Sequence, residues 1–184
     1  MEIYNDKNIL IDKKFYDNLN TLALYNRKKQ IMIVGGKIDG DKVVIDQKSF
    51  KWFTKDEFEF KDVNKEIIPE SVLTTAMLDV ASLGNDAVIL LQTHTCKNDY
   101  DDFLYGSLSD TDLINSKKLY LLCSFKNYKF FDGVITGKHI YFWSIDNEYL
   151  KPIQVDCYVD GEKVNVKVPT TMQELINSVL EGRE

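Results

Sequence analysis

The sequence predicts an α/β fold, with a mixed β-sheet flanked by helices and a small C-terminal hairpin-helix extension. The first observation is a continuous apolar run, Ala87 to Leu91, typical of a buried strand. The second is that helical apolar spacing precedes this run and a helix-start pattern follows it. The third is a pair of turn signals, Asp39-Gly40 and Thr136-Gly137-Lys138, which join short apolar segments as in β-hairpins.

The N-terminal half is expected to contain a helix, a hairpin and a second helix. Asp12 can cap a helix over residues 13–25, where apolar residues recur at 3.6-residue spacing. Residues 30–46 are expected to form the hairpin, and Gly35-Gly36 should end or bend its first strand. The second helix should start at Pro69 and close at the C-terminal cap Gly84, both of which suit those positions.

A third helix is expected from Ser109 to about Lys118. Strands are then expected over residues 119–123, 129–136 and 140–144. We divide the chain into a main domain, residues 1–150, and an extension, residues 151–184. The extension should consist of a hairpin turning at Asp160-Gly161 and a helix over residues 170–180, packed on the main domain.

Composition limits the class of protein. The 184 residues suffice for one domain with a core, and 44% apolar content with 12% aromatics indicates a folded chain. The net charge of −6 argues against general binding to nucleic acids or anionic membranes, which requires a basic surface. Frequent Lys, Asn, Ile, Asp and Tyr suggest an AT-rich genome, bacterial or phage.

A cytoplasmic location is expected, because residues 1–10 contain no signal-peptide core and no apolar run approaches eighteen residues. The three cysteines, Cys96, Cys123 and Cys157, form no CxxC pair and no even disulfide set. This pattern fits a reducing compartment.

Potential metal ligands lie at the end of the central strand and at the start of the next helix. His94 and Cys96 follow the strand, and Ser109 and Asp112 open the helix. Imidazole, thiolate and carboxylate groups all bind zinc, and the Ser109 hydroxyl can hydrogen-bond to an oxyanion. Simpler interpretations remain open: Ser109 and Asp112 also match a capping box, and Cys96 can be a small buried apolar residue. His139 is most simply structural.

This arrangement resembles the JAMM/MPN (JAB) domain family of zinc-dependent isopeptidases. The family pattern is an upstream Glu, His-Ser/Thr-His at a strand end, and Ser-x-x-Asp at a helix start. In that family the two His and the Asp hold zinc, the Glu activates the zinc-bound water, and the Ser supports the tetrahedral intermediate. The order of elements over residues 9–146 is also similar to the JAMM/MPN fold, an α/β sheet flanked by helices.

The chain departs from the family pattern at the histidine pair. Either His94-Thr95-Cys96 occupies it, with cysteine as the second ligand, or Gln92-Thr93-His94 does, with glutamine as the first. The gap to Ser109 is longer than the family usually shows, which suggests an inserted loop.

The water-activating Glu is also replaced. The resemblance places it where this chain has Lys28, Lys29 and Gln30, and Gln30 is closest to it in shape. A carboxamide cannot take a proton from a metal-bound water. Natural loss of the site and a deliberate Glu-to-Gln change both fit, and in a shifted register Glu57 or Glu59 would serve instead.

Two functions are compatible with these residues. The first is a JAMM-like zinc hydrolase with an impaired or mutated site, acting on an isopeptide or peptide bond, for example of a ubiquitin-like protein. His94, Asp112 and Cys96 would then hold the zinc, Ser109 would stabilise the oxyanion, and Gln30 would mark the lost base. The second is a catalytically inactive MPN-like scaffold or protein-interaction module; inactive members of the family usually pair with active ones. The expected partner is a protein, not a nucleic acid or a membrane.

Overall fold

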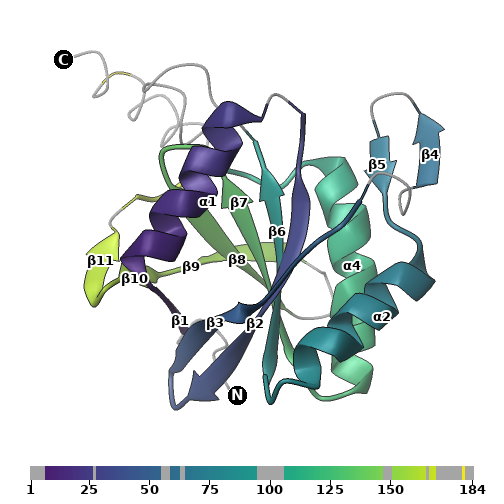
Figure 1. The fold of residues 1–184 in the computed structure, drawn as a ribbon, viewed down its shortest axis with the longest axis horizontal. Coiled ribbons are helices and arrows are strands. Elements are labelled where there is room, and N and C mark those ends of the chain that lie inside the picture. The colour runs from purple at the N-terminus through teal and green to yellow at the C-terminus, as the bar shows by residue number, and fades with distance from the viewer. Residues whose placement is uncertain are drawn as a thin grey trace.

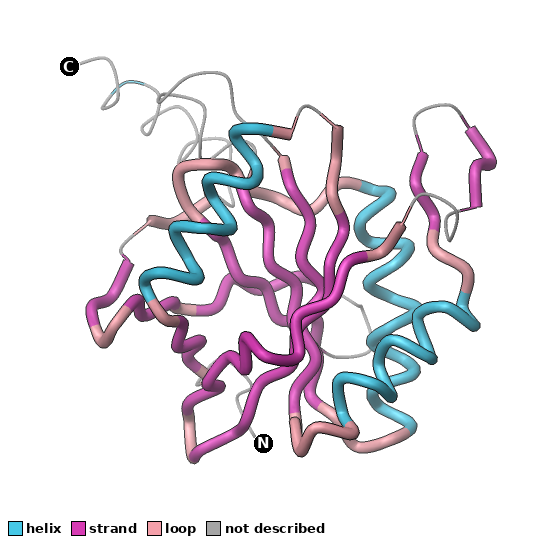
Figure 2. Tube along the Cα trace, viewed as in Figure 1, coloured by secondary structure: helices cyan, strands magenta, loops and turns pink. Residues whose placement is uncertain are grey.

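A curled nine-stranded mixed sheet forms the centre of the molecule, with helices on both faces (Figure 1). The structure is a computed structural model that describes residues 7–26, 28–54, 59–62, 65–94, 106–146, 151–164, 166–168 and 180. Figure 2 shows the magenta sheet between cyan helices. The sequence-based expectation of a mixed α/β fold is confirmed at this level.

Three helices are interspersed among the strands, and the last helix is followed by strands alone in the described part of the chain. The helices of the described residues are α1 (Lys13–Tyr25), α2 (Glu70–Ala81) and α4 (Asp110–Phe125). The strands of the large sheet are β1 (Asn8–Ile11), β2 (Ile31–Asp39), β3 (Lys42–Trp52), β6 (Ala87–Thr93), β7 (Lys129–Ile135), β8 (Ile140–Asp146), β9 (Lys151–Val155), β10 (Cys157–Val159) and β11 (Glu162–Val164). A separate hairpin consists of β4 (Glu59–Asp62) and β5 (Lys65–Ile67).

The sheet curls because its two ends are joined by consecutive strands. The strand order is β11-β10-β1-β3-β2-β6-β7-β8-β9, and only Asp156 separates β9 from β10. β9 pairs with β8 at one end, whereas β10 pairs with β1 near the other. The division expected after residue 150 therefore falls between two neighbouring strands of one sheet. The expected hairpin turns at Asp160-Gly161, and residues 170–179 of the expected helix lie outside the described residues.

Two apolar layers cover the two faces of the sheet. On one face, α1 buries Tyr16, Leu19 and Ala23. On the other face lie α2 and α4, as Figure 1 shows. Because side chains alternate along a strand, β2 serves both layers. Met32 and Val34 face α1, whereas Ile31 and Ile33 face α2 and α4.

Helix α1 is fixed at its start and against the β7–β8 turn. The Asp12 carboxylate accepts a hydrogen bond from the Phe15 N–H at 3.0 Å, as the expected N-cap. The Tyr16 hydroxyl accepts from the Ile140 N–H at 3.1 Å, and the Asn20 side-chain oxygen accepts from the Gly137 N–H at 3.1 Å. Buried polar groups of α1 therefore set the position of this turn.

The strand expected over residues 119–123 is wrong, because these residues belong to α4. Asp112, Ser116, Leu119 and Cys123 are all buried, at the three- and four-residue spacing of one helix face. A short apolar run cannot by itself distinguish a strand from a buried helix segment. In the described residues, no helix is long and apolar enough to cross a membrane.

Gly35 lies in close contact with α2 and with the loop that follows this helix. The pairing of β2 with β3 shifts register between Ile33 and Gly35, so the glycine bends the strand and does not end it. A Cβ atom at Gly35 would lie 2.6 Å from Val80 Cγ1 and would also overlap the side chain of Asn85. Only a residue without a side chain fits this position.

We expect Gly35→Ala to lower the free energy of unfolding by about 1–3 kcal/mol, because the methyl group must push α2 away from the sheet. Lys37→Ala, two residues further along β2 at an exposed position, should change it by less than about 0.5 kcal/mol. Urea unfolding of both variants measures the difference. Equal effects would contradict the close approach.

Candidate functional site

The end of β6 points two polar side chains at α4. Val88 and Leu90 of this strand lie in the core beneath α2 and α4, and Gln92 and His94 continue the same alternation. The backbone N–H of His94 donates to the carbonyl of Ile135 at 2.8 Å, which extends the pairing with β7. The strand pattern therefore fixes the direction of both side chains.

The N-terminus of α4 is a capping box, as one interpretation of the sequence expected. The Ser109 hydroxyl accepts from the Asp112 N–H at 3.2 Å, and Asp112 Oδ2 accepts from the Ser109 N–H at 2.9 Å. This reciprocal pair turns the Asp112 side chain inward, where only 1% of it is exposed.

Asp112 and His94 meet at this point. His94 Nε2 lies 2.8 Å from Asp112 Oδ2, and the Lys29 ammonium group contacts Asp112 Oδ1. Burial alone would raise the pKa of Asp112, but the hydrogen bond from His94 and the charge of Lys29 lower it well below its usual range. Asp112 is therefore a buried carboxylate held in its charged form by the protein.

A second buried carboxyl group, Asp132 on β7, lies beneath the same helix. Ser116 Oγ donates to Asp132 Oδ1 at 2.7 Å. Within the described part of the chain, neither Asp132 Oδ2 nor the buried Gln92 Nε2 makes a hydrogen bond of good geometry, although Gln92 is near enough to lower the pKa of Asp132. Burial raises the pKa of Asp132 well above its usual range; the Ser116 hydrogen bond opposes this shift and the nearby charge of Asp112 adds to it. The pKa values of the two carboxyl groups are thus shifted in opposite directions.

The residues that the structure brings together do not fit a bound zinc ion. Asp112 Oδ2 is hydrogen-bonded to His94, and Asp112 Oδ1 forms an ion pair with Lys29. A divalent ion about 4 Å from an ammonium group is repelled by about 8 kcal/mol at an effective dielectric constant of about 20. Among the described residues, no three His, Cys, Asp or Glu side chains are grouped closely enough to hold a metal.

The expected ligands and base are thus only partly assembled. His94, Ser109 and Asp112 lie together, and Gln92 faces the same way as His94. Cys96 and Glu57 lie outside the described residues.

Gln30 is not part of this cluster. Its Nε2 donates to the Lys28 carbonyl at 3.2 Å and its backbone N–H to Thr93 Oγ1 at 2.8 Å. By the alternation of β2, Gln30 is in phase with Met32, on the α1 face of the sheet.

Sequence reasoning missed Lys29, Ser116 and Asp132. The signal for Lys29 was its position in the alternation of side chains along the chain. It precedes Ile31 and Ile33 at two-residue steps, so its side chain lies on the same face of the sheet, towards α4. The signal for Asp132 was a carboxylate inside an otherwise apolar strand, which calls for a buried partner.

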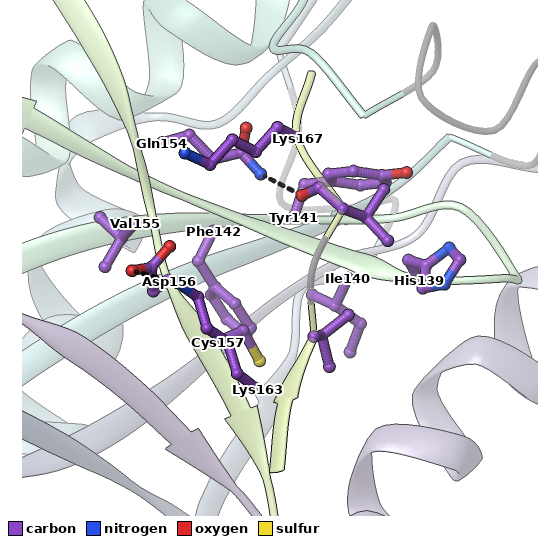
Figure 3. A pocket seen from close by; sticks show the side chains of 12 residues that line it. His139, Ile140, Tyr141, Phe142, Gln154, Val155, Asp156, Cys157, Lys163 and Lys167 are labelled. Carbon is purple, nitrogen blue, oxygen red and sulfur yellow. Dashed lines mark hydrogen bonds and ion pairs between the residues drawn. The ribbon is translucent and has the colours of Figure 1, made fainter. Parts of the chain in front are cut away.

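A small cavity elsewhere offers no chemistry of its own. It lies among His139, Tyr141, Gln154 and Cys157, where β8 meets β9 and β10 (Figure 3). Its volume of about 20 Å³ suffices for about one water molecule. Burial raises the pKa of the Cys157 thiol to about 12, which makes it a poor nucleophile. His139 packs edge-on against Tyr141, in keeping with a structural role.

We expect Asp112→Asn to lower the free energy of unfolding by about 2–4 kcal/mol, because it removes a buried charge from Lys29 and weakens the hydrogen bond with His94. Asp110→Asn, an exposed change in the same helical turn, should cost less than about 1 kcal/mol. Denaturant unfolding at pH 7 measures both. A similar small loss in the two variants would contradict the role of Asp112 as the centre of the cluster.

We expect Asp132→Asn to stabilise the protein increasingly as pH rises. The pKa of Asp132 is raised in the folded state. The wild-type protein therefore loses stability as the pH rises from the usual carboxyl pKa, about 3.9, to the pKa of Asp132 in the folded state. The free energy of unfolding of the asparagine variant should therefore increase relative to that of the wild type by up to about 1.4 kcal/mol for each pH unit over this pH range. Unfolding at pH 5, 6 and 7 tests this, and a difference that does not change with pH would refute it.

Comparisons with known proteins add little to this geometry. No known family model matches the chain, and no curated protein matches it in sequence. Among solved structures, the chain is similar to the solution structure of a protein from Salinibacter ruber (strain DSM 13855), with 10% sequence identity and a TM-score of 0.42. That match covers 89% of this chain and 94% of the other. At these values the similarity says nothing about family or function.

Proposed function

We propose that this chain is a JAMM/MPN-like domain that has lost zinc-dependent hydrolysis and acts as a protein-interaction module. One observation carries the proposal: both oxygens of Asp112 are bonded by groups of the protein, Lys29 on Oδ1 and His94 with the Ser109 N–H on Oδ2. The carboxylate that would bind zinc in the family is here a structural anion.

Three placements support the relationship to the family. His94 follows a buried central strand, Asp112 opens the next helix, and the two side chains are 2.8 Å apart. Ser109 precedes Asp112 by three residues at the helix cap. The succession of a helix, a hairpin, a second helix, a buried strand and a third helix is also compatible with the resemblance.

The chemistry needed for hydrolysis is not supported. The base position expected near Gln30 carries a carboxamide directed to the Lys28 carbonyl, away from Asp112. In the Gln92-Thr93-His94 register, Gln92 stands where the resemblance implies a first histidine, and a carboxamide oxygen is a weaker zinc ligand than an imidazole. Asp132 is fully buried and bonded to Ser116, so it is poorly placed to take a proton from a metal-bound water.

The outer face of α4 supports a role in binding another protein. Ile114, Leu121 and Phe125 lie on one side of this helix, at steps of seven and four residues. Their exposed fractions are 37%, 56% and 93%. An apolar stripe of this kind suits packing against a helix of a partner. In keeping with the pairing seen for inactive family members, the proposed partner is a second MPN-like domain with an intact metal site.

An impaired zinc-dependent isopeptidase is the second candidate. The observation that favours it is the same contact between His94 and Asp112, which keeps two residues of a zinc site within reach of one ion. It requires Lys29 to leave the carboxylate and a third ligand, such as Cys96, to approach.

Metal analysis and an activity assay separate the two functions. We expect the purified wild-type chain, supplied with Zn²⁺, to retain no stoichiometric zinc and to leave isopeptide-linked di-ubiquitin intact, because both oxygens of Asp112 are already bonded to groups of the protein. Asp112→Asn should behave identically in both assays. Near-stoichiometric zinc and cleavage by the wild type, both lost in Asp112→Asn, would establish the hydrolase and overturn the proposal.

A further inference from the structure

We propose that Lys29 is the resident cation of this site and that its ammonium group excludes divalent metal ions from His94 and Asp112. The inference rests on the proposed function, because it takes Asp112 to correspond to a family metal ligand. It goes further by assigning the loss of metal binding to one residue outside the family's ligand pattern.

The backbone around Lys29 is fixed beside the end of β6. Gln30, the next residue, donates its N–H to Thr93 Oγ1 at 2.8 Å, and Ile31 pairs with Gln92. The carbonyl of Gln30 also accepts from the Thr93 N–H at 3.0 Å. These bonds hold the chain within one lysine length of Asp112.

The Lys29 side chain is directed inward and not to solvent. Its side chain is 23% exposed, whereas the neighbouring Lys28 is an exposed residue. Its alternation with Ile31 and Ile33 places it on the α4 face of the sheet. The four-carbon stem can cover apolar surface while the ammonium group reaches the carboxylate.

A metal ion would have to displace existing bonds at each of its two available ligands. At Asp112 Oδ1 it meets the ammonium group, and at His94 Nε2 it meets the bond to Asp112 Oδ2. The first obstacle is a like charge and the second is only a hydrogen bond. The lysine is therefore the larger of the two obstacles.

Gln92 provides the means to isolate the effect of Lys29. Its side chain is buried and faces the same way as His94, and it also lies near Asp132. Gln92→His would add a second imidazole two residues before His94. This substitution restores a His-x-His pair but leaves the ammonium group in place.

The test is a double-mutant cycle in the full chain with Zn²⁺ as the probe. Affinities are measured by competition with a chromogenic chelator for wild type, Lys29→Met, Gln92→His and the double variant. Methionine keeps the length and apolar stem of lysine without its charge. We expect Lys29→Met/Gln92→His to bind Zn²⁺ at least about 100-fold more tightly than Gln92→His alone, since repulsion at this distance corresponds to several powers of ten.

Two matched variants complete the design. Lys28→Met/Gln92→His loses an exposed charge one residue away and should bind no better than Gln92→His. Lys29→Arg/Gln92→His keeps the cation and should also bind weakly. The midpoint of thermal unfolding should rise with Zn²⁺ only in Lys29→Met/Gln92→His, which also reports whether that variant is folded.

Equal affinities of Gln92→His and Lys29→Met/Gln92→His, with both variants folded, would overturn the role of Lys29. So would equally tight binding by Lys29→Arg/Gln92→His. Neither result would affect the proposed function, whose failure appears separately as zinc binding and di-ubiquitin cleavage by the wild type.

Discussion

A buried carboxylate governs this part of the molecule. Asp112 is 1% exposed, and an ionised carboxylate at such a depth is tolerated only with charged or hydrogen-bonding partners. Its partners come from three places: the α1–β2 loop supplies Lys29, the end of β6 supplies His94, and the cap of α4 supplies the Ser109 N–H. Satisfying this one group therefore fixes how the loop, the strand and the helix meet.

The same charge sets the state of its neighbour. Asp132 lies near Asp112 and is fully buried, and its hydrogen-bonding partner, Ser116, carries no charge. Two carboxylates that share a low-dielectric region cannot both ionise cheaply, so burial and the charge of Asp112 raise the pKa of Asp132, whereas the partners of Asp112 lower its own pKa. The polar cluster beneath α4 is thus a set of interacting groups, in which Lys29 and His94 lower the pKa of Asp112 and burial raises the pKa of Asp132.

Local signals made much of the fold predictable. Elements begin or turn where the sequence predicts it at Asp12, Asp39-Gly40 and Pro69. The apolar run 119–123, by contrast, is compatible with either a strand or a helix, and only the packing of α4 against the sheet distinguishes the two. At the site, the meeting of His94 and Asp112 could be expected from a strand end followed by a helix start. The contribution of Lys29 could not be expected in this way, because Gln30 is the residue closest in shape to the glutamate of the family. The contacts show that the side chain of Lys29, and not that of Gln30, reaches Asp112.

The proposed loss of metal binding has a simple physical requirement. Removing a metal ion from a buried site leaves its carboxylate uncompensated, at a cost of several kcal/mol. A chain can relieve this cost by replacing the aspartate or by placing a cation against it. Asp112 is not easily replaced here, because it is also the acidic half of the capping box that starts α4. Lys29, on the loop before β2, supplies the compensating positive charge, and Asp112 keeps its place in the capping box of α4. The contacts among helix, strand and loop therefore do not require a metal ion.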